Sequence, residues 1–127
     1  MRPKSPTLTE QELEIMKIVW GRQQATVRDV YENLLERRKI AYTTVMTMMK
    51  ILEQKHYLRK AQVDRAFVYR PAQPKNQVIK GMVREFVNRV FNGSAEPLLV
   101  HLIEDRKLSE ADLKELSRMI RKESSHG

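Results

Sequence analysis

Hydrophobic residues recur at helical spacing from the start of the chain. The first segment opens on Thr9 and Glu12, a capping-box pair in which each side chain bonds the other residue's backbone N–H. We therefore predict a first helix that begins after Thr9 and ends near Gly21. Its apolar positions are Leu13, Met16, Val19 and Trp20.

A second helix is predicted by the same pattern a few residues later. Thr26 and Asp29 repeat the capping pair, and the apolar stripe that follows runs to about Arg38. The stripe consists of Val27, Val30, Tyr31, Leu34 and Leu35. A short turn at residues 39–41 then leads into a third segment.

The third segment is predicted to be a helix from about Tyr42 to Gln54. Its buried face has the spacing i, i+3, i+4, i+7, with Val45, Met48, Met49 and Leu52. At 3.6 residues per turn, the outward stripe is then Thr43, Met46, Thr47, Lys50 and Gln54. Surface helices usually carry good helix formers such as Glu, Lys and Gln, so this stripe indicates a surface with a special role.

A short hairpin is predicted after the third helix. β-branched and aromatic residues lie on either side of residues 63–66, and the tip carries Arg65. Tyr57, Phe67 and Tyr69 are spaced as strand residues, which favours a place in the hairpin core. Three helices followed by a hairpin is the order of a winged helix-turn-helix, in which the third helix enters the major groove of DNA.

The charge of the chain supports an anionic partner. The 127 residues carry a formal net charge of +8, with 14 Lys and Arg against 8 Asp and Glu in residues 1–72. Residues 36–70 hold nine basic and three acidic side chains, and they include the Thr-rich helix. A solvated face would mix the two signs, so this segment favours binding to nucleic acid. Short hydroxyl side chains allow close approach to base edges.

Several kinds of chemistry find no support in the sequence. There are no cysteines, which excludes disulfides, thiol catalysis and Cys-based metal sites and fits a reducing cytosol. The three histidines are far apart, and the four glycines are scattered singly rather than gathered in a phosphate-binding loop. We find no nucleophile motif, no signal peptide and no membrane span. We expect a cytoplasmic protein that is not an enzyme and needs neither metal nor cofactor.

The remainder of the chain, residues 73–127, is predicted to form a second, helical domain after a winged-helix domain at 1–72. One helix should run from about Asn76 to Phe91 and stop at Asn92-Gly93, and the last should open on Ser109 with Asp112. Such short helices cannot bury their apolar faces alone, so we predict a homodimer. The predicted dimer residues are Ile79, Val83, Phe86, Val90, Leu98, Leu99, Leu102, Leu113, Leu116 and Ile120.

The sequence resembles the penicillinase repressor family, the BlaI/MecI type with its copper-responsive relatives. The resemblance is carried by LTEQELEIMKIVW, TVRDVYENL, AYTTVMTMMKILEQKHYL, FVYRP and LLVHLIEDRKLSEADLKELSRMI, which span nearly the whole chain. It implies a dimeric bacterial winged-helix repressor that binds double-stranded operator DNA as inverted repeats with TACA and TGTA half-sites, typically over β-lactam resistance genes.

The resemblance also implies roles for individual residues. Thr43, Thr44, Met46 and Thr47 would occupy base-reading positions, and the whole predicted DNA-binding set is Arg28, Tyr42, Thr43, Thr44, Met46, Thr47, Lys50, Gln54 and Arg65. In the β-lactam branch, the metalloprotease activity of a membrane sensor leads to a cut in the C-terminal unit. Alignment places that cut at His101-Leu102.

The sequence departs from the family pattern in three respects. Some relatives carry Lys and Arg where this chain has Thr43 and Met46, and the Cys motif of the copper-responsive branch is absent. The usual Lys-Gly before the hairpin is Lys55-His56, so either His56 adopts a positive φ or the turn differs. The alternative function is a winged-helix protein-interaction or assembly subunit whose basic face meets an acidic protein.

Overall fold

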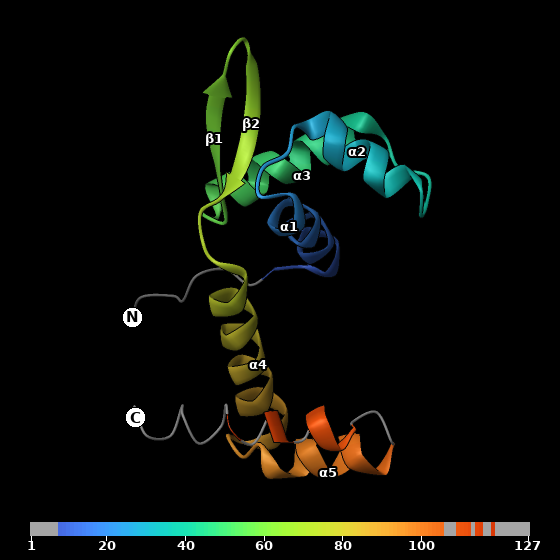
Figure 1. Cartoon of the computed structure of the whole chain (residues 1–127), viewed down its shortest axis with the longest axis vertical. Helices are drawn as coiled ribbons and strands as arrows, with labels where there is room; N and C mark the ends of the chain where they lie inside the picture. Colours follow the sequence, from blue (N-terminus) through green and yellow to red (C-terminus); the bar gives the residue numbers. More distant parts are fainter. Residues whose placement is uncertain (1–7, 106–108, 113, 116–117, 119–127) are drawn as a thin grey trace. The chain divides into compact units, whose positions relative to one another are not determined.

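The structure is a computed structural model that describes residues 8–105, 109–112, 114, 115 and 118. The chain divides into two compact units, Met1–Met82 and Val83–Gly127. The elements of the first unit are α1 (Glu10–Arg22), α2 (Val27–Leu35), α3 (Tyr42–Gln54), β1 (Leu58–Val63) and β2 (Ala66–Pro71). Figure 1 shows the β1–β2 hairpin extending away from the three helices of this unit. This arrangement confirms the predicted winged helix-turn-helix.

Both predicted capping boxes are present. The Thr9 backbone N–H donates to Glu12 Oε1 at 2.9 Å, and the Glu12 N–H donates to Thr9 Oγ1 at 3.1 Å. Thr26 and Asp29 make the equivalent pair, with both distances 3.0 Å. Each box satisfies N–H groups that the first turn of a helix leaves without partners. The helix starts are therefore determined locally, which is why the sequence pattern located them.

The core of the first unit lies between the three helices and the base of the hairpin. Its fully buried side chains come from every one of these elements: Ile15, Met16, Val19, Val30, Leu34, Val45, Met49, Leu52 and Leu58. The predicted stripes of α1 and α2 were partly wrong. Ile15 and Ile18 are buried whereas Leu13 and Trp20 are only partly so, and Leu35 is 43% exposed because α2 ends there, at the surface.

The hairpin is antiparallel, with Val63 paired to Ala66 across a two-residue turn at the predicted position. Asp64 takes φ 57, a left-handed conformation that Asp tolerates better than most residues. The base of the hairpin is tied to the connection between α1 and α2, because Ala25 and Tyr69 exchange two backbone hydrogen bonds of 3.0 and 2.8 Å. The wing is therefore held to the helices by backbone as well as by side chains.

One predicted core residue of the hairpin is not in the core. Tyr57 and Tyr69 are buried, as expected, but Phe67 is 54% exposed. Phe67 lies on the same face as Tyr69 and two residues nearer the tip, where the helices no longer cover the strands. Strand alternation predicted the face correctly but not how far the core extends along it.

α4 (Lys75–Phe91) begins within the first unit. Val78 is buried in the core of that unit, and Met82 packs against it. The unit boundary therefore falls within the helix, between Met82 and Val83, and not at 72/73 as the sequence suggested. The helix ends as predicted, since Asn92 and Gly93 follow it with φ 55 and 90.

The second unit contains the rest of α4, α5 (Glu96–Glu104) and a further helical stretch from residue 110. α5 has no buried residue. The stretch opens on the predicted cap, in which Asp112 N–H donates to Ser109 Oγ at 3.1 Å. Within the described residues, no helix has both the length and the apolar character needed to cross a membrane.

Candidate nucleic-acid interface

The residues of α3 that were predicted to face outward are exposed in the structure. Val45, Met48, Met49 and Leu52 point into the core, and the helix has the predicted bounds. The predicted outward residues Thr43, Thr44, Met46, Thr47, Lys50 and Gln54 are all exposed. Three hydroxyls, one thioether, one ammonium and one amide therefore share a surface that the described residues of the first unit leave exposed.

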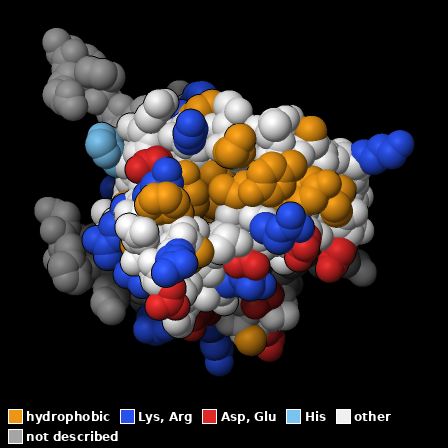
Figure 2. Space-filling model, turned by 90° about the horizontal axis from the view of Figure 1, so that it is seen from above, with side chains coloured by type: hydrophobic (Ala, Val, Ile, Leu, Met, Phe, Trp, Pro, Cys, Tyr) orange, Lys and Arg blue, Asp and Glu red, His pale blue; other side chains and the backbone are white. Residues whose placement is uncertain are grey.

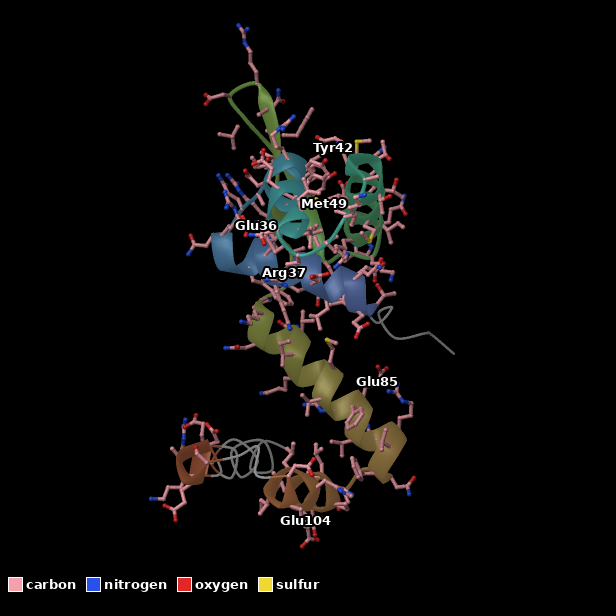
Figure 3. All side chains as sticks on the ribbon, turned by 90° about the vertical axis from the view of Figure 1, so that its right-hand side faces the viewer. Glu36, Arg37, Tyr42, Met49, Glu85 and Glu104 are labelled. Atoms are coloured by element: carbon pink, nitrogen blue, oxygen red, sulfur yellow. The ribbon has the colours of Figure 1, made fainter. Side chains whose placement is uncertain are left out.

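Tyr42 stands at the first position of α3 and is 39% exposed. Its ring meets that of Tyr31 on α2 edge to face, with centroids 5.3 Å apart. Figure 3 shows Tyr42 at the outer end of the helix and Met49 between α2 and α3. Edge-to-face aromatic pairs are favourable, so the contact with Tyr31 stabilises this position of the Tyr42 ring at the surface.

Arg28 is exposed on the first turn of α2 and lies 3.4 Å from Glu32 one turn later. A surface pair of this kind is weak and easily exchanged for another partner. The neighbouring Asp29 carboxylate accepts a hydrogen bond from the Thr26 backbone N–H. This bond is the main reason that the pKa of Asp29 is lowered, and the Arg22 charge adds to it, although desolvation acts in the opposite direction. Arg28 therefore remains available to an external anion.

Three of the nine basic residues in the segment 36–70 form salt bridges with Glu12 or Glu14 of α1. Glu14 on α1 lies 2.6 Å from Arg38 and 3.3 Å from Arg37, and the Arg38 hydrogen bond is the main reason that the pKa of Glu14 is lowered. Lys55 lies 2.8 Å from the buried Glu12. Figure 3 shows Arg37 beside α1. The sequence-based charge count therefore overstated the positive charge at the surface.

The wing carries four of the other basic groups, Arg59, Lys60, Arg65 and Arg70, and Arg70 Nε donates to Gln24 Oε1 at 3.0 Å. Arg65 is exposed in the turn, and Lys60 Nζ lies 4.7 Å from the centre of the Phe67 ring and 6.0 Å from that of Tyr69. A cation over an aromatic face is attracted to it and loses freedom. The sequence did not predict that Phe67 holds the Lys60 ammonium. The register explains the contact, because Lys60 pairs with Tyr69 and Gln62 with Phe67, which brings Lys60 close to both rings.

Basic and apolar side chains meet on this face of the first unit. Figure 2 shows a band of hydrophobic side chains with Lys and Arg around it and with Asp and Glu among them. The large hydrophobic residues of the first unit that are exposed are Leu35, Tyr42, Met46, Val63 and Phe67. A surface with positive charge, hydroxyls and apolar groups suits double-stranded DNA, whose backbone is anionic and whose thymines present methyl groups in the major groove.

The predicted dimer residues lie in the second unit or next to it. Val83, Phe86 and Val90 on α4 are 49%, 40% and 49% exposed, whereas Ile79, Leu98, Leu99 and Leu102 are partly buried. Phe86 and Phe91 pack edge to face at 5.9 Å, and Phe91 lies 6.1 Å from the exposed His101. Leu113, Leu116 and Ile120 lie outside the described residues.

The three-helix core, the exposed third helix and the basic hairpin define a winged-helix transcriptional regulator. The sequence profile of the penicillinase repressor matches residues 8–122. The chain therefore belongs to the penicillinase repressor family, as its motifs predicted.

Individual relatives agree with this assignment. The transcriptional regulator BlaI of Mycobacterium tuberculosis is 36% identical over 111 residues, which cover 86% of this chain and 80% of that protein. The penicillinase repressor of Bacillus licheniformis is 27% identical, over 92% of this chain and 91% of its own length. These relatives carry the names of regulators and repressors, not of enzymes.

A solved structure supports the fold of the first unit. The chain resembles the solution structure of monomeric Bacillus licheniformis BlaI in complex with the blaP half-operator, with a TM-score of 0.51 and 29% identity. The match covers 57% of this chain and 89% of that chain.

Proposed function

We propose that the protein is a homodimeric repressor that binds a palindromic operator through α3 and the wing. The observation that carries the proposal is the exposed Thr-rich face of α3 beside a basic wing, in a chain whose first unit resembles a BlaI structure in complex with a half-operator. Family membership supports half-sites of the TACA and TGTA type. The regulated genes would include β-lactam resistance or stress genes.

In this proposal α3 enters the major groove and reads bases. Thr43, Thr44 and Thr47 offer hydroxyls to base edges, and Met46 offers an apolar contact to a thymine methyl. Tyr42 lies at the start of α3, and Lys50 and Gln54 continue the outward stripe towards its end, so we place all three within reach of phosphates or outer bases. Arg28 on α2 and Arg65 in the wing contact the phosphate backbone and set the register of the complex.

The proposed dimer uses the exposed apolar side chains of the C-terminal part. Val83, Phe86 and Val90 follow helical spacing on α4, so one face of this helix presents them together. Monomeric soluble proteins rarely leave such rows uncovered. A two-fold axis would pair two copies of α3 with two half-sites, so that the second half-site binds at a high effective concentration.

Repression would end by proteolysis in α5, carried out through a membrane sensor with metalloprotease activity. His101 and Leu102 lie in this helix, and the His101 carbonyl accepts a hydrogen bond from Asp105 N–H at 3.0 Å. A protease needs extended backbone, so α5 must first unwind. A nine-residue helix without a buried residue opens at low cost, which supports a cut here.

A mobility shift with the region upstream of the gene tests the proposal. We expect a complex that survives competition by scrambled DNA of the same length and that weakens linearly in log affinity with log salt. A variant that ends at His101 should keep its winged helix but bind at least about 100-fold more weakly, because bivalency is lost. Equal binding to scrambled DNA would instead favour the protein-interaction function.

A further inference from the structure

The segment that joins the wing to α4 is fastened to the winged helix at three points. The Ala72 N–H donates to the Tyr57 carbonyl at 2.8 Å, and the Gln73 side-chain amide donates to the His56 carbonyl at 2.9 Å. The Trp20 indole N–H on α1 donates to the backbone carbonyl of Gln73 at 3.0 Å. Gln73, two residues before α4, is therefore bonded both to α1 and to the turn between α3 and β1.

His56 supplies the fixed point for this connection. It follows α3 with φ 70, its N–H bonds the Glu53 carbonyl at 3.0 Å, and the Tyr57 N–H bonds the Leu52 carbonyl at 2.9 Å. These two bonds form a Schellman motif, which ends the helix in one defined conformation. The carbonyl that receives the Gln73 amide is thus held rigidly by the end of α3, the helix proposed to read bases.

The start of α4 is held as firmly as the segment before it. Pro74 follows Gln73, and its carbonyl accepts the Val78 N–H at 3.1 Å in the first turn. Val78 is 6% exposed in the core of the first unit, and Met82 packs against the same core. The first two turns of α4 therefore belong to the winged-helix unit, and their direction relative to α3 is set by the contacts of Gln73, Trp20 and Val78.

We infer that Trp20 and Gln73 are positioning residues that select the spacing of the two half-sites, by fixing the direction in which α4 leaves each winged helix. The inference rests on the proposed dimeric operator binding. A helix of 17 residues is about 25 Å long, so a tilt of about 10° at its start moves its far end by about 4 Å. That displacement is close to the rise of one base pair, about 3.4 Å. Loss of the Trp20 and Gln73 contacts should therefore let the dimer accept half-site spacings that differ by about one base pair.

Two full-length variants test the inference. Trp20→Phe keeps an aromatic ring but removes the indole N–H, and Gln73→Ala removes the side-chain amide but keeps the carbonyl. Gln11→Ala, a change at an exposed position of α1 outside the proposed DNA-binding surface, is the matched control. Each protein is titrated against a duplex with one TACA half-site and against duplexes whose TACA and TGTA half-sites are separated by the best spacer or by one or two base pairs more or fewer.

We expect both variants to bind the single half-site within about twofold of the unmodified protein. Their affinity for the best two-site duplex should fall about tenfold, and the preference among spacers should flatten, while Gln11→Ala keeps the preference. Trp20 is the single tryptophan of the chain, so its fluorescence reports directly whether Gln73→Ala frees the indole. Sedimentation should show that both variants remain dimers.

Two outcomes would overturn the inference. Equal losses on the half-site and on the two-site duplexes would mean that the anchor serves stability alone, and an unchanged spacer preference would mean that spacing is set elsewhere. If the unmodified protein itself gains nothing from a second half-site, the proposed dimeric function fails first, and the spacing role fails with it. The half-site titration separates these cases.

Discussion

The ammonium of Lys55 lies 2.8 Å from the carboxylate of Glu12, so the residue that ends α3 is paired with the first turn of α1. The same carboxylate oxygen accepts the Thr9 N–H at 2.9 Å. Burial raises the pKa of Glu12, but the hydrogen bonds from Lys55 and Thr9 outweigh it and the pKa is lowered overall. The capping box of α1 therefore also holds the end of α3.

This pair predicts an acid-dependent part of the stability. A carboxyl whose pKa is lowered in the folded state stabilises it above the unfolded pKa, near 4.3, and this contribution is lost as the pH falls through the lowered value. Glu12→Gln should reduce the free energy of unfolding by about 2 kcal/mol at pH 7 and by less at pH 3. Urea denaturation at both pH values measures the difference. A constant difference would show that the charge of Glu12 is immaterial.

Thr47 should act in specificity. Thr47→Ala removes a hydroxyl from the exposed face of α3 without touching the core, so the fold should persist. We expect the specific operator to bind more weakly by about 1 to 3 kcal/mol while non-specific DNA binds nearly as before. Anisotropy titrations with both DNAs give the comparison. Similar losses on the two DNAs would argue against base reading by Thr47.

Arg65 and Arg37 should differ although both are exposed arginines of the basic segment. Arg65→Ala should lower the slope of log affinity against log salt by about 1, because it removes one phosphate contact. Arg37→Ala is the matched control, since Arg37 faces Glu14 and should leave the slope unchanged. Titrations at four or more salt concentrations measure both slopes. The assignment of the wing fails if Arg37 proves the more important residue.

His56 carries backbone strain that glycine would relieve. A non-glycine residue in the left-handed region costs about 1 to 2 kcal/mol, and glycine removes this cost. Part of the stability gained is offset, because an additional glycine raises the entropy of the unfolded chain. His56→Gly should therefore raise the free energy of unfolding by about 0.5 to 1 kcal/mol, with His56→Asn in between. Chemical denaturation tests the order. A destabilised glycine variant would mean that the imidazole makes a contact worth more than the strain.

The dimer prediction concerns the exposed row on α4. Val83→Asp with Val90→Asp puts two charges into the proposed interface, where an unpaired charge is costly to bury. Both positions are about half exposed in the single chain, so the first unit should fold as before. Sedimentation should find a monomer for the double variant and a dimer for the unmodified protein. The interface lies elsewhere if the variant still dimerises.

Local features of the fold were predictable from the sequence, and contacts between distant segments were not. The bounds of α3, both capping boxes and the hairpin turn depend on residues within a few positions of one another. The pairing of Arg37 and Arg38 with Glu14 joins segments that only the folded core brings together. The composition of residues 36–70 therefore could not reveal which charges are free.

The site shows the same division. The outward residues of α3 follow from helical geometry once the buried face is known, so the sequence identified them. Phe67 was assigned to the core because alternation gives a face but not its depth, and the anchor at Gln73 is made largely by a backbone carbonyl. A backbone acceptor has no signature in the sequence, which is why the hydrogen bond from Trp20 to the Gln73 carbonyl could not be predicted.

The backbone bridge between Ala25 and Tyr69 divides the wing into two regions that differ in how well they tolerate substitution. Below the bridge, a substitution disturbs the hydrogen bonds that attach the hairpin to the helices. Above it, Asp64 and Arg65 at the tip are exposed and are not part of the core, so substitutions there should cost the fold little stability. Substitutions at a few tip residues can therefore change the charge and reach of the wing while the rest of the domain keeps its structure.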